Sequence, residues 1–343
     1  MQALVKYAPG PGNVELRDVP EPELGRGAVL IAVAAVGVCG TDRLAIEGAE
    51  HFPAPRILGH EVSGVVQALG PETEADGLAV GDHVTLETDA YVCGVCHYCS
   101  QGENNRCPHR LAIGTTTDGG MAERIAIRRP SVHRLPDGVS LAAGALIEPL
   151  SIAVHSVIEQ GPPVAGEVVV VTGPGAVGLL VAQVARAVGA TVVLIGRERH
   201  AERLAVARSL GIEHAVDGDN TDVKALVDEL SDGVGAYVLY ECSGGAGIVE
   251  NSLPLLQRGA RIVLVAFFRT PPVIDIDVLI NRELELVGSR GKRSADYRRA
   301  LRLVADDQVA LEPLITARLP LSEWRQGLAL MSAGEKVVFE IAH

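Results

Sequence analysis

The segment EVVVVTGPGAVGLLVAQVARAVGATVVLI, residues 167–195, indicates the fold of the second half of the chain. It opens with a continuous apolar run, as expected for a parallel strand that is buried on both faces. Apolar residues at helical spacing follow, and a second strand is predicted from Thr191. The turn between the first strand and the helix reads GPGAVG (173–178) and fits the pattern G-x-G-x-x-G. The segment therefore predicts one βαβ unit of an open, doubly wound parallel sheet.

The residues of this turn have separate physical tasks in a dinucleotide site. Gly173 makes the tight turn, Gly175 lets the backbone approach a pyrophosphate, and Gly178 lets the helix pack closely on the strand. Ala176 and Val177 begin the helix, where backbone N–H groups face the phosphates. A lone G-x-G-x-x-G is a weak signal in a chain with 38 glycines, but here its strand–turn–helix context supports it.

The two halves of the 343-residue chain differ in their pattern of predicted strands and helices, and two domains are expected at this length. Residues 1 to about 150 predict short strands between Gly- and Pro-rich turns, for example over 28–39, 61–70 and 83–90. The alternation of the second half continues with a helix over 201–211 and strands over 236–241 and 261–267. Two helical segments and a closing strand follow from about residue 293. The fold class is therefore α/β, with a β-rich first half.

The bulk charge excludes several classes of partner. A net charge of −13 disfavours nucleic acid and anionic membranes, since both attract clustered Lys and Arg.

The start of the chain has no secretory signal pattern, and no apolar run is long enough to span a membrane. We therefore expect a reducing, cytoplasmic setting, where clustered cysteines bind metal or react.

Four of the six cysteines lie in CGVCHYCSQGENNRC, residues 93–107. Short spacings let one loop aim several thiolates at a tetrahedral zinc ion, and four protein ligands leave no position for a substrate. The sequence therefore predicts a structural zinc site. An iron–sulfur cluster, a redox dithiol, four unremarkable thiols and a role for His97 are the alternatives. The four predicted ligands are Cys93, Cys96, Cys99 and Cys107.

Four further residues are weak signals alone but informative together: Cys39 in CGTD, His60 and Glu61 in GHE, and Glu148 in EPL. With GD-V, CGxCxxCxxGxxxxC and GxGxxG, these motifs follow one another along nearly the whole chain. The set resembles the zinc-dependent medium-chain dehydrogenase/reductase family, which includes alcohol and polyol dehydrogenases. The resemblance implies a GroES-like catalytic domain over 1–155, a Rossmann domain over 156–292, and a segment over 293–343 that returns to the catalytic domain.

The resemblance implies a second, catalytic zinc. Cys39 and His60 align with ligands of that ion, and Glu148 stands where other alcohol dehydrogenases carry a cysteine. The EPL form looks like the sorbitol, threonine and glucose dehydrogenase branch, in which a glutamate at the position of Glu61 or of Glu148 ligates zinc directly or through water. The sequence leaves these two open. Pro149 is expected to hold Glu148 in an extended backbone, and Asp42 to accept the second N–H of His60.

Thr41 stands where the family uses a hydroxyl to take the proton from the substrate alcohol. Many members have a histidine three residues later, but this chain has Leu44. The proton is then expected to leave through water, a ribose hydroxyl or His51.

The end of the second predicted strand bears on the choice of cofactor. It reads TVVLIGRERH (191–200), with Gly196 where NAD-binding members carry an acid, followed by Arg197 and Arg199. Removing a carboxylate removes repulsion of a 2′-phosphate, and a guanidinium pairs with that group, so the sequence favours NADP. Use of both cofactors stays open, with the arginines solvating a surface turn beside Glu198. Cys242 is expected to be a small buried residue near the nicotinamide.

The resemblance implies hydride transfer between NAD(P) and a secondary hydroxyl of a polyol, cyclitol or sugar. Arg290 and the stretch TTTDGG (115–120) are expected near the substrate. Alternatives are a threonine or butanediol dehydrogenase, a zinc-free quinone reductase relative, and, from another class, a zinc-stabilised sensor or binding protein without catalysis. A homodimer or homotetramer is implied, paired through residues 273–280 or 284–289.

Overall fold

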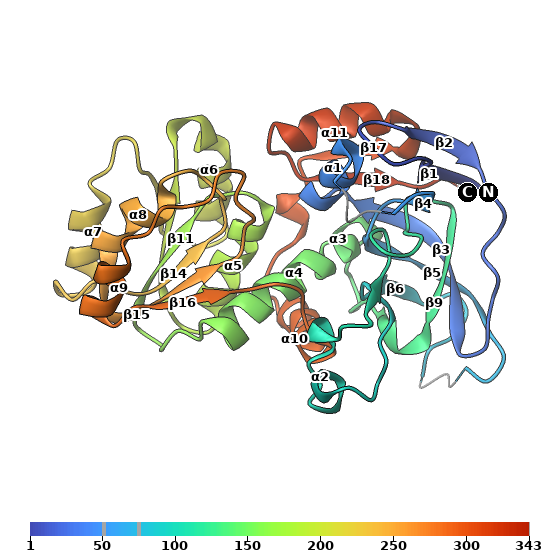
Figure 1. Cartoon of the computed structure of the whole chain (residues 1–343), viewed down its shortest axis with the longest axis horizontal. Helices are drawn as coiled ribbons and strands as arrows, with labels where there is room; N and C mark the ends of the chain where they lie inside the picture. The colour runs from blue at the N-terminus through green and yellow to red at the C-terminus, as the bar shows by residue number, and fades with distance from the viewer. Residues whose placement is uncertain (50–52, 74–76, 343) are drawn as a thin grey trace. The chain divides into compact units, whose positions relative to one another are not determined.

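The computed structural model describes residues 1–49, 53–73 and 77–342. Its contacts divide the chain into two compact units, both drawn in Figure 1. The β-rich unit comprises Met1–Glu148, Arg293–Leu301 and Leu311–His343, and the parallel-sheet unit comprises Pro149–Lys292 and Arg302–Ala310. Within the described residues, no helix has the length and apolar character needed to cross a membrane.

The β-rich unit is organised around one long strand, β3 (Ala28–Gly37). The other strands of the unit are β1 (Gln2–Lys6), β2 (Val14–Asp18), β4 (Arg56–Ile57), β5 (Glu61–Leu69), β6 (His83–Leu86), β7 (Asp89–Tyr91), β8 (Leu111–Ala112), β9 (Arg124–Arg128), β10 (Val132–Arg134), β17 (Ala317–Pro320) and β18 (Val337–Glu340). Its main sheet has the order β10-β6-β5-β3-β18-β17, with β9 also paired to β3. From Ala28 to Ala34, every second residue of β3 is buried, and the last three residues of the strand, 35–37, are all buried. The central strand therefore ends deep inside the unit.

The unit also contains the short helices α1 (Gly40–Glu47), α2 (His97–Ser100), α3 (Leu141–Ala145) and α11 (Trp324–Ser332). Helices α3 and α11 contact this sheet, whereas α2 lies in the loop that carries four cysteines. Helix α10 (Ser294–Ala305) is tied to the same unit through Tyr297, whose hydroxyl donates to the Leu86 carbonyl at 2.9 Å. The same hydroxyl lies 2.6 Å from Thr85 Oγ1. These two hydrogen bonds are buried, so the beginning of α10 is held firmly on β6.

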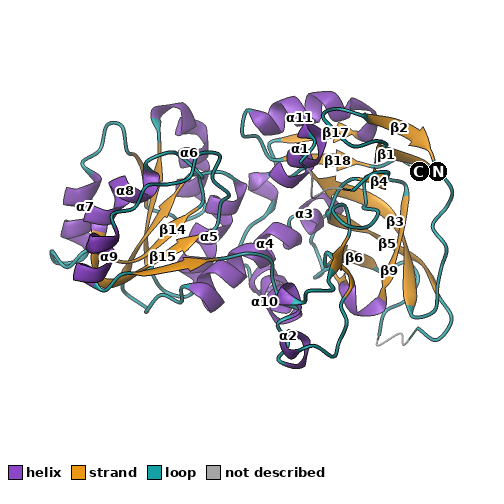
Figure 2. Ribbon diagram, in the orientation of Figure 1, coloured by secondary structure: helices purple, strands orange, loops and turns teal. Residues whose placement is uncertain are grey.

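The parallel-sheet unit contains six strands in the order β13-β12-β11-β14-β15-β16. They are β11 (Val168–Thr172), β12 (Thr191–Gly196), β13 (His214–Asp217), β14 (Ala236–Glu241), β15 (Leu256–Leu264) and β16 (Glu285–Gly288). The helices are α4 (Ile147–Val154), α5 (Ala176–Ala187), α6 (Ala201–Ser209), α7 (Val223–Leu230), α8 (Ile248–Ser252) and α9 (Ile276–Arg282), and Figure 2 shows helices packed around the strands. All neighbouring strands are parallel. The predicted doubly wound sheet is confirmed, and its strand order reverses between β11 and β14, where such sheets bind ligands.

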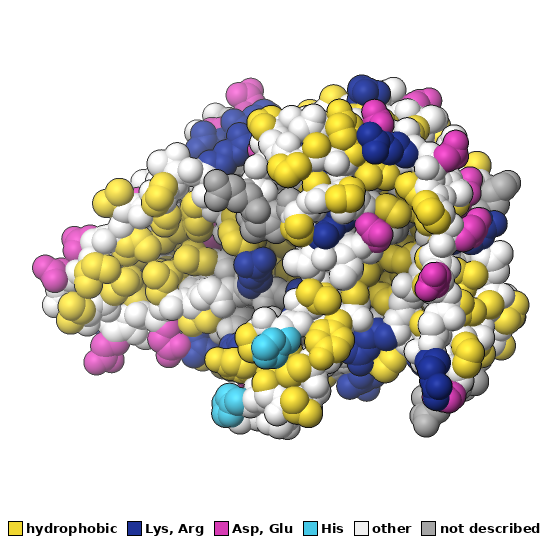
Figure 3. Space-filling model, turned by 45° about the vertical axis from the view of Figure 1, so that its right-hand side comes forward, with side chains coloured by type: hydrophobic (Ala, Val, Ile, Leu, Met, Phe, Trp, Pro, Cys, Tyr) yellow, Lys and Arg dark blue, Asp and Glu magenta, His cyan; other side chains and the backbone are white. Residues whose placement is uncertain are grey.

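Apolar side chains of α9, of the segment before it and of β16 are exposed. Val273, Ile276, Ile280 and Leu286 are 78%, 60%, 67% and 43% exposed. Figure 3 shows apolar side chains, in yellow, gathered on one face of the parallel-sheet unit. Because β16 pairs only with β15 among the described strands, its other edge has free backbone hydrogen-bonding groups.

Two local predictions were wrong. Glu148 is the second residue of α4 and not extended, because Pro149 lies in the first helical turn, where a backbone N–H has no intrahelical acceptor and its loss costs nothing. The strand predicted over 261–267 begins five residues earlier, at Leu256, and ends at Leu264.

Candidate active site and metal centres

The ends of β3 and β5 bring three predicted zinc ligands together in the β-rich unit. Cys39 is the N-cap residue of α1, just after β3, while His60 precedes β5 and Glu61 begins it. The antiparallel register places Gly37 opposite Glu61. One thiolate, imidazole and carboxylate atom from Cys39, His60 and Glu61 lie within 4.8 Å of one another. His60 and Glu61 are 7% and 2% exposed.

Gly37 leaves the space that the Glu61 carboxylate occupies. A Cβ at residue 37 would lie 2.0 Å from Glu61 Oε2, so no other residue fits there without moving that side chain. The loop TTTDGG (115–120) packs against Gly59, the residue before His60. A Cβ on Gly119 would lie 2.2 Å from the carbonyl oxygen of Gly59. Close backbone approach therefore shapes the surroundings of His60.

Asp42 connects the segments that carry Cys39 and His60. Its carboxylate accepts from the Cys39 N–H at 2.9 Å and from the Gly59 N–H at 3.2 Å. Asp42 Oδ1 lies 3.8 Å from His60 Nδ1, which is within ion-pair range but too long for the direct hydrogen bond that the sequence predicts. His60 Nδ1 is buried and has no hydrogen-bond partner.

Lys336 also belongs to this site, although no sequence motif points to it. It directly precedes β18, forms an ion pair with Glu61 Oε2, and donates to the Val38 carbonyl at 3.3 Å. Burial alone would lower the pKa of Lys336, but the Glu61 carboxylate outweighs it and raises the pKa above its usual range. Glu61 therefore has a buried cation beside it. The sequence separates the two residues by 275 positions and carries no signal for the pair.

Glu148 is 5% exposed and lies outside the compact Cys39–His60–Glu61 group of ligand atoms. Its charge nevertheless acts on that group. Burial lowers the pKa of His60, whereas Cys39, Asp42 and Glu148 raise it to a net value of about 10. So much negative charge around one imidazole favours a cation at this position, which fits a divalent metal.

Thr41 lies in the first turn of α1, with its Oγ1 3.7 Å from Cys39 Sγ. Leu44, one turn later, packs on the hydrophobic core of the β-rich unit. It therefore has no polar group to continue a proton path from Thr41. His51, the other predicted route, lies outside the described residues.

The four cysteines of residues 93–107 also come together. Their sulfur atoms lie within 4.8 Å of one another, with 3.6 Å between Cys107 and Cys93 and 3.9 Å between Cys93 and Cys99. Backbone N–H groups of Val95 and Cys96 lower the pKa of Cys93 to about 6, so this thiol is ready to bind metal as a thiolate at neutral pH. The geometry fits one tetrahedral ion held by four thiolates.

The glycine turn of the parallel-sheet unit has the close contacts that its sequence predicts. Gly173 has a φ of +89°, and a Cβ there would lie 2.7 Å from Ser243 Cβ. A Cβ on Gly178 would lie 1.9 Å from the Gly173 carbonyl oxygen, whereas Gly175, the N-cap of α5, faces open space. Gly175 therefore leaves room for a ligand, and the other two glycines make the turn compact.

Glu241 holds the loop that supports Gly173, and no sequence motif points to this residue. This carboxylate is fully buried and accepts from the backbone N–H of Ser243 at 2.7 Å and of Gly244 at 3.0 Å. Thr172, at the end of β11, donates to it at 3.4 Å. Cys242, which lies between Glu241 and Ser243 in the chain, is partly buried. Burial and the negative charge of Glu241 raise the pKa of the Cys242 thiol well above its usual range. Such a thiol is a poor nucleophile.

Gly196 ends β12, and a Cβ there would lie 3.0 Å from both Leu204 Cδ2 and Pro174 Cγ. An acid at this position would therefore need its neighbours to shift. Arg197 and Arg199 follow it, and both are exposed. Arg290 lies elsewhere in the same unit, with its guanidinium 5.5 Å from the centre of the Phe267 ring.

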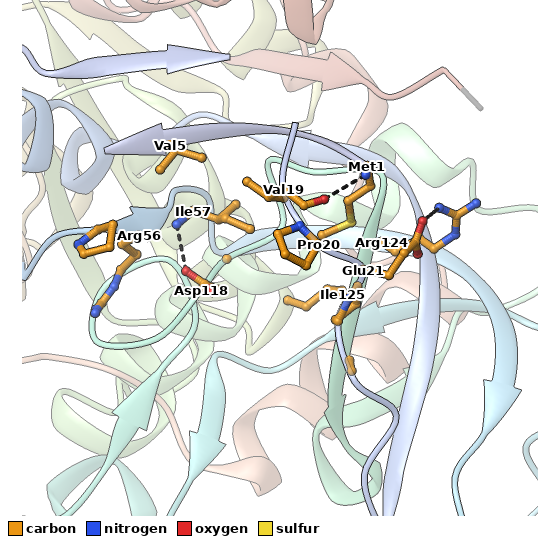
Figure 4. A pocket seen from close by; sticks show the side chains of 14 residues that line it. Met1, Val5, Val19, Pro20, Glu21, Arg56, Ile57, Asp118, Arg124 and Ile125 are labelled. Carbon is orange, nitrogen blue, oxygen red and sulfur yellow. Dashed lines mark hydrogen bonds and ion pairs between the residues drawn. The ribbon is translucent and has the colours of Figure 1, made fainter. Parts of the chain in front are cut away.

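A cavity of about 390 Å³ opens in the β-rich unit beside Met1, Val19 and Ile57 (Figure 4). Asp118 accepts from the Ile57 N–H at 2.9 Å, and Arg124 pairs with Glu21 at 2.6 Å. None of the predicted zinc ligands lines this cavity. Because it lacks those ligands, it is not the candidate active site.

Comparisons with known proteins agree with this arrangement. Residues 25–137 match the family model described as the alcohol dehydrogenase GroES-like domain, and residues 176–306 match that of the zinc-binding dehydrogenases. Sorbitol dehydrogenase of Halalkalibacterium halodurans is 39% identical over 98% of each chain. D-arabitol-phosphate dehydrogenase of Enterococcus avium is 36% identical over 98% of this chain and 96% of its own.

A solved structure with 32% identity is a zinc-binding dehydrogenase from Sinorhizobium meliloti bound to NADP. It superimposes with a TM-score of 0.87, covering 99% of this chain and 98% of that one. The predicted pairing of a GroES-like domain with a Rossmann domain is therefore confirmed. The chain belongs to the zinc-dependent medium-chain dehydrogenase family and is an oxidoreductase.

Proposed function

We propose that the protein oxidises a secondary hydroxyl of a polyol, cyclitol or sugar, with NADP preferred over NAD and with one catalytic and one structural zinc ion. The observation that carries the proposal is the buried cluster of Cys39, His60 and Glu61. Cys/His/carboxylate ligand sets that leave one coordination position open are typical of catalytic zinc. The names of the sorbitol and arabitol-phosphate relatives support a polyhydroxylated substrate.

Cys39, His60 and Glu61 would hold the catalytic ion, and Cys93, Cys96, Cys99 and Cys107 the structural one. Between the two glutamates that the sequence leaves open, the geometry favours Glu61 as the direct ligand, since Glu148 lies outside the compact group. Glu148 would then act on the site through its charge or through water. Zinc, when bound, supplies positive charge that polarises the substrate hydroxyl.

The remaining residues position groups and move the proton. Thr41 Oγ1, beside Cys39, would accept the proton of the substrate hydroxyl. Asp42 holds the Cys39 and His60 segments in register, and Lys336 orients the Glu61 carboxylate. The nicotinamide cofactor, when bound, supplies the hydride chemistry. Since Leu44 ends the side-chain path, the proton would leave through water or a ribose hydroxyl.

The cofactor site would use Gly173, Gly175, Ala176, Val177, Gly178, Gly196, Arg197, Arg199 and Cys242. NADP is favoured because the space for an acid at residue 196 is restricted and two exposed arginines follow. The NADP-bound relative supports the same choice. The functional domains would run over 1–155, 156–292 and 293–343, and the protein would act in the cytoplasm.

We also propose that the protein forms homo-oligomers through the parallel-sheet unit. The β16 edge carries free hydrogen-bonding groups, and Val273, Ile276 and Ile280 are exposed next to it. A second copy would cover both. Light scattering of the purified protein should give at least twice the chain mass of 35.9 kDa.

The decisive test of the activity is cofactor reduction by the purified protein with NADP and with NAD. The substrate panel should contain polyols, cyclitols, sugars, threonine and butanediol. We expect turnover of a polyhydroxylated substrate with NADP, lost on chelation and restored by zinc. Cys39→Ser should abolish it. No turnover of any substrate, or full activity of Cys39→Ser, would refute the proposal.

A further inference from the structure

The short turn that follows β12 contains a histidine that the predicted cofactor site does not use. His200 ends the 3₁₀ turn Glu198–His200 and directly precedes α6. Its ring is half-buried, unlike the exposed side chains of Arg197 and Arg199. Three arginines lie close enough to act on its charge: Arg197, Arg199 and Arg203. The turn and the first turn of α6 therefore collect four basic side chains after Gly196.

The hydrogen bonds of His200 are mismatched. Its Nδ1 lies 3.2 Å from the backbone nitrogen of Arg197, and its Nε2 lies 3.2 Å from Nε of Arg199. Both neighbours are N–H donors. A neutral imidazole has only one acceptor nitrogen, and an imidazolium has none. The ring therefore satisfies at most one of these two donors, and the charged ring satisfies neither.

The surrounding charge also disfavours protonation. Burial lowers the pKa of His200, and the guanidinium groups of Arg199, Arg203 and Arg197 lower it further. Asp219, from the loop after β13, acts in the opposite direction. Asp219 also accepts from the Glu198 N–H at 3.4 Å. The turn thus has more positive than negative charge facing one ring, and a bound anion would reverse the balance.

We propose that His200 is a phosphate-binding residue that takes up a proton from solvent when the 2′-phosphate of NADP binds beside Arg197 and Arg199. The dianionic phosphate supplies the acceptors that the turn lacks, and a protonated ring donates to it as the guanidinium groups do. NAD presents a neutral hydroxyl in the same place, so its binding takes up no proton here. The inference rests on the proposed preference for NADP and adds to it a proton-linked contact.

The linkage has a defined sign. Binding of the phosphate raises the pKa of His200 above that of the free protein, so the added affinity is largest at low pH and is lost as pH rises through the pKa of the bound form. The phosphate itself has a second pKa of about 6, so its own titration must be separated from that of the ring. Comparison of two variants with the same ligand removes the phosphate contribution.

The test is calorimetric binding of adenosine 2′,5′-bisphosphate and of adenosine 5′-monophosphate, which differ only in the 2′-phosphate. Both are titrated at pH 7 in two buffers of different ionisation enthalpy, which gives the number of protons taken up. The proteins compared are the full-length wild type, His200→Gln and His214→Gln. Glutamine keeps one acceptor for the Arg197 N–H, and His214, at the start of β13, is the matched control. Melting temperatures verify that each variant is folded.

We expect the wild type and His214→Gln to take up more protons with the bisphosphate than His200→Gln does, and the monophosphate to show no such difference. Between pH 6 and pH 8 the bisphosphate affinity of the wild type should fall about threefold more than that of His200→Gln, which is the change that a rise of about one unit in the pKa of His200 produces over this range. Equal proton uptake by the wild type and His200→Gln would overturn the role of His200 and leave NADP preference intact. Equal affinity of the wild type for the two nucleotides would instead refute NADP preference itself, and the proposal with it.

Discussion

Lys336→Met should destabilise the β-rich unit unless zinc is bound. The substitution removes the cation beside Glu61, which is 2% exposed, and leaves a buried carboxylate without its partner. Breaking such a pair costs about 3–5 kcal/mol, and loss of the donor to the Val38 carbonyl adds about 1 kcal/mol. At about 2–4 °C per kcal/mol for a unit of this size, the melting temperature of the metal-free protein should fall by roughly 8–24 °C.

Differential scanning calorimetry of the chelated and the zinc-loaded protein measures this effect. Zinc supplies positive charge to Glu61, so the loaded variant should lose much less stability than the chelated one. The double variant Lys336→Met/Glu61→Gln removes the unpaired charge and should recover part of the chelated protein's loss. The reasoning is refuted if chelated Lys336→Met melts within 2 °C of the wild type, or if the double variant is less stable than the single one.

Four further predictions concern the cofactor site and the proposed structural metal. Gly196→Asp should shift the ratio of kcat/KM for NADP to kcat/KM for NAD at least tenfold towards NAD, because the new carboxylate repels the 2′-phosphate. Contact of the new side chain with Leu204 should also lower the stability of the protein somewhat. An unchanged ratio would contradict the proposed preference for NADP. Cys99→Ser should lower the zinc content from two ions per chain to one, and unchanged content by atomic emission would argue against the structural site. After chelation, Cys93 should react with iodoacetamide down to about pH 6, where its thiolate forms, and peptide mass spectrometry should show protection once zinc is restored. Glu241→Gln should weaken cofactor binding about tenfold, because one carboxylate oxygen is replaced by an amide N–H₂ that faces the Gly244 N–H. Glu241→Asp is the milder control, and unchanged cofactor affinity of Glu241→Gln would exclude a role of Glu241 in shaping the cofactor site.

The fold of the parallel-sheet unit could be read from the sequence because its signals are local. The strand predicted over 236–241 coincides with β14, and the glycine turn joins β11 to α5 as expected. Each depends on periodicity or on a backbone conformation that nearby residues decide. The start of β15 was missed because Gly259 interrupts its apolar pattern.

The sequence predicts the candidate site less completely, because the contacts of this site join segments that are far apart in the chain. Motif order placed Cys39, His60 and Glu61 together as a hypothesis, but no local rule connects Glu61 to Lys336 or Tyr297 to Thr85. Likewise, the bias of a pre-proline residue towards extended backbone gave the wrong conformation for Glu148, because that rule ignores the position of Pro149 in a helix.

The pairing of β18 with β3 also affects the order in which the two clusters of potential metal ligands can assemble during biosynthesis. Val338 pairs with Gly37, about 300 residues earlier in the chain, and Lys336 lies next to that pairing. A ribosome that adds roughly 5–20 residues per second needs about 15–60 s to cover this distance. The four-cysteine loop spans only residues 93–107 and can close as soon as it emerges. During translation, the four thiols can therefore come together well before Glu61 has the lysine that balances its charge.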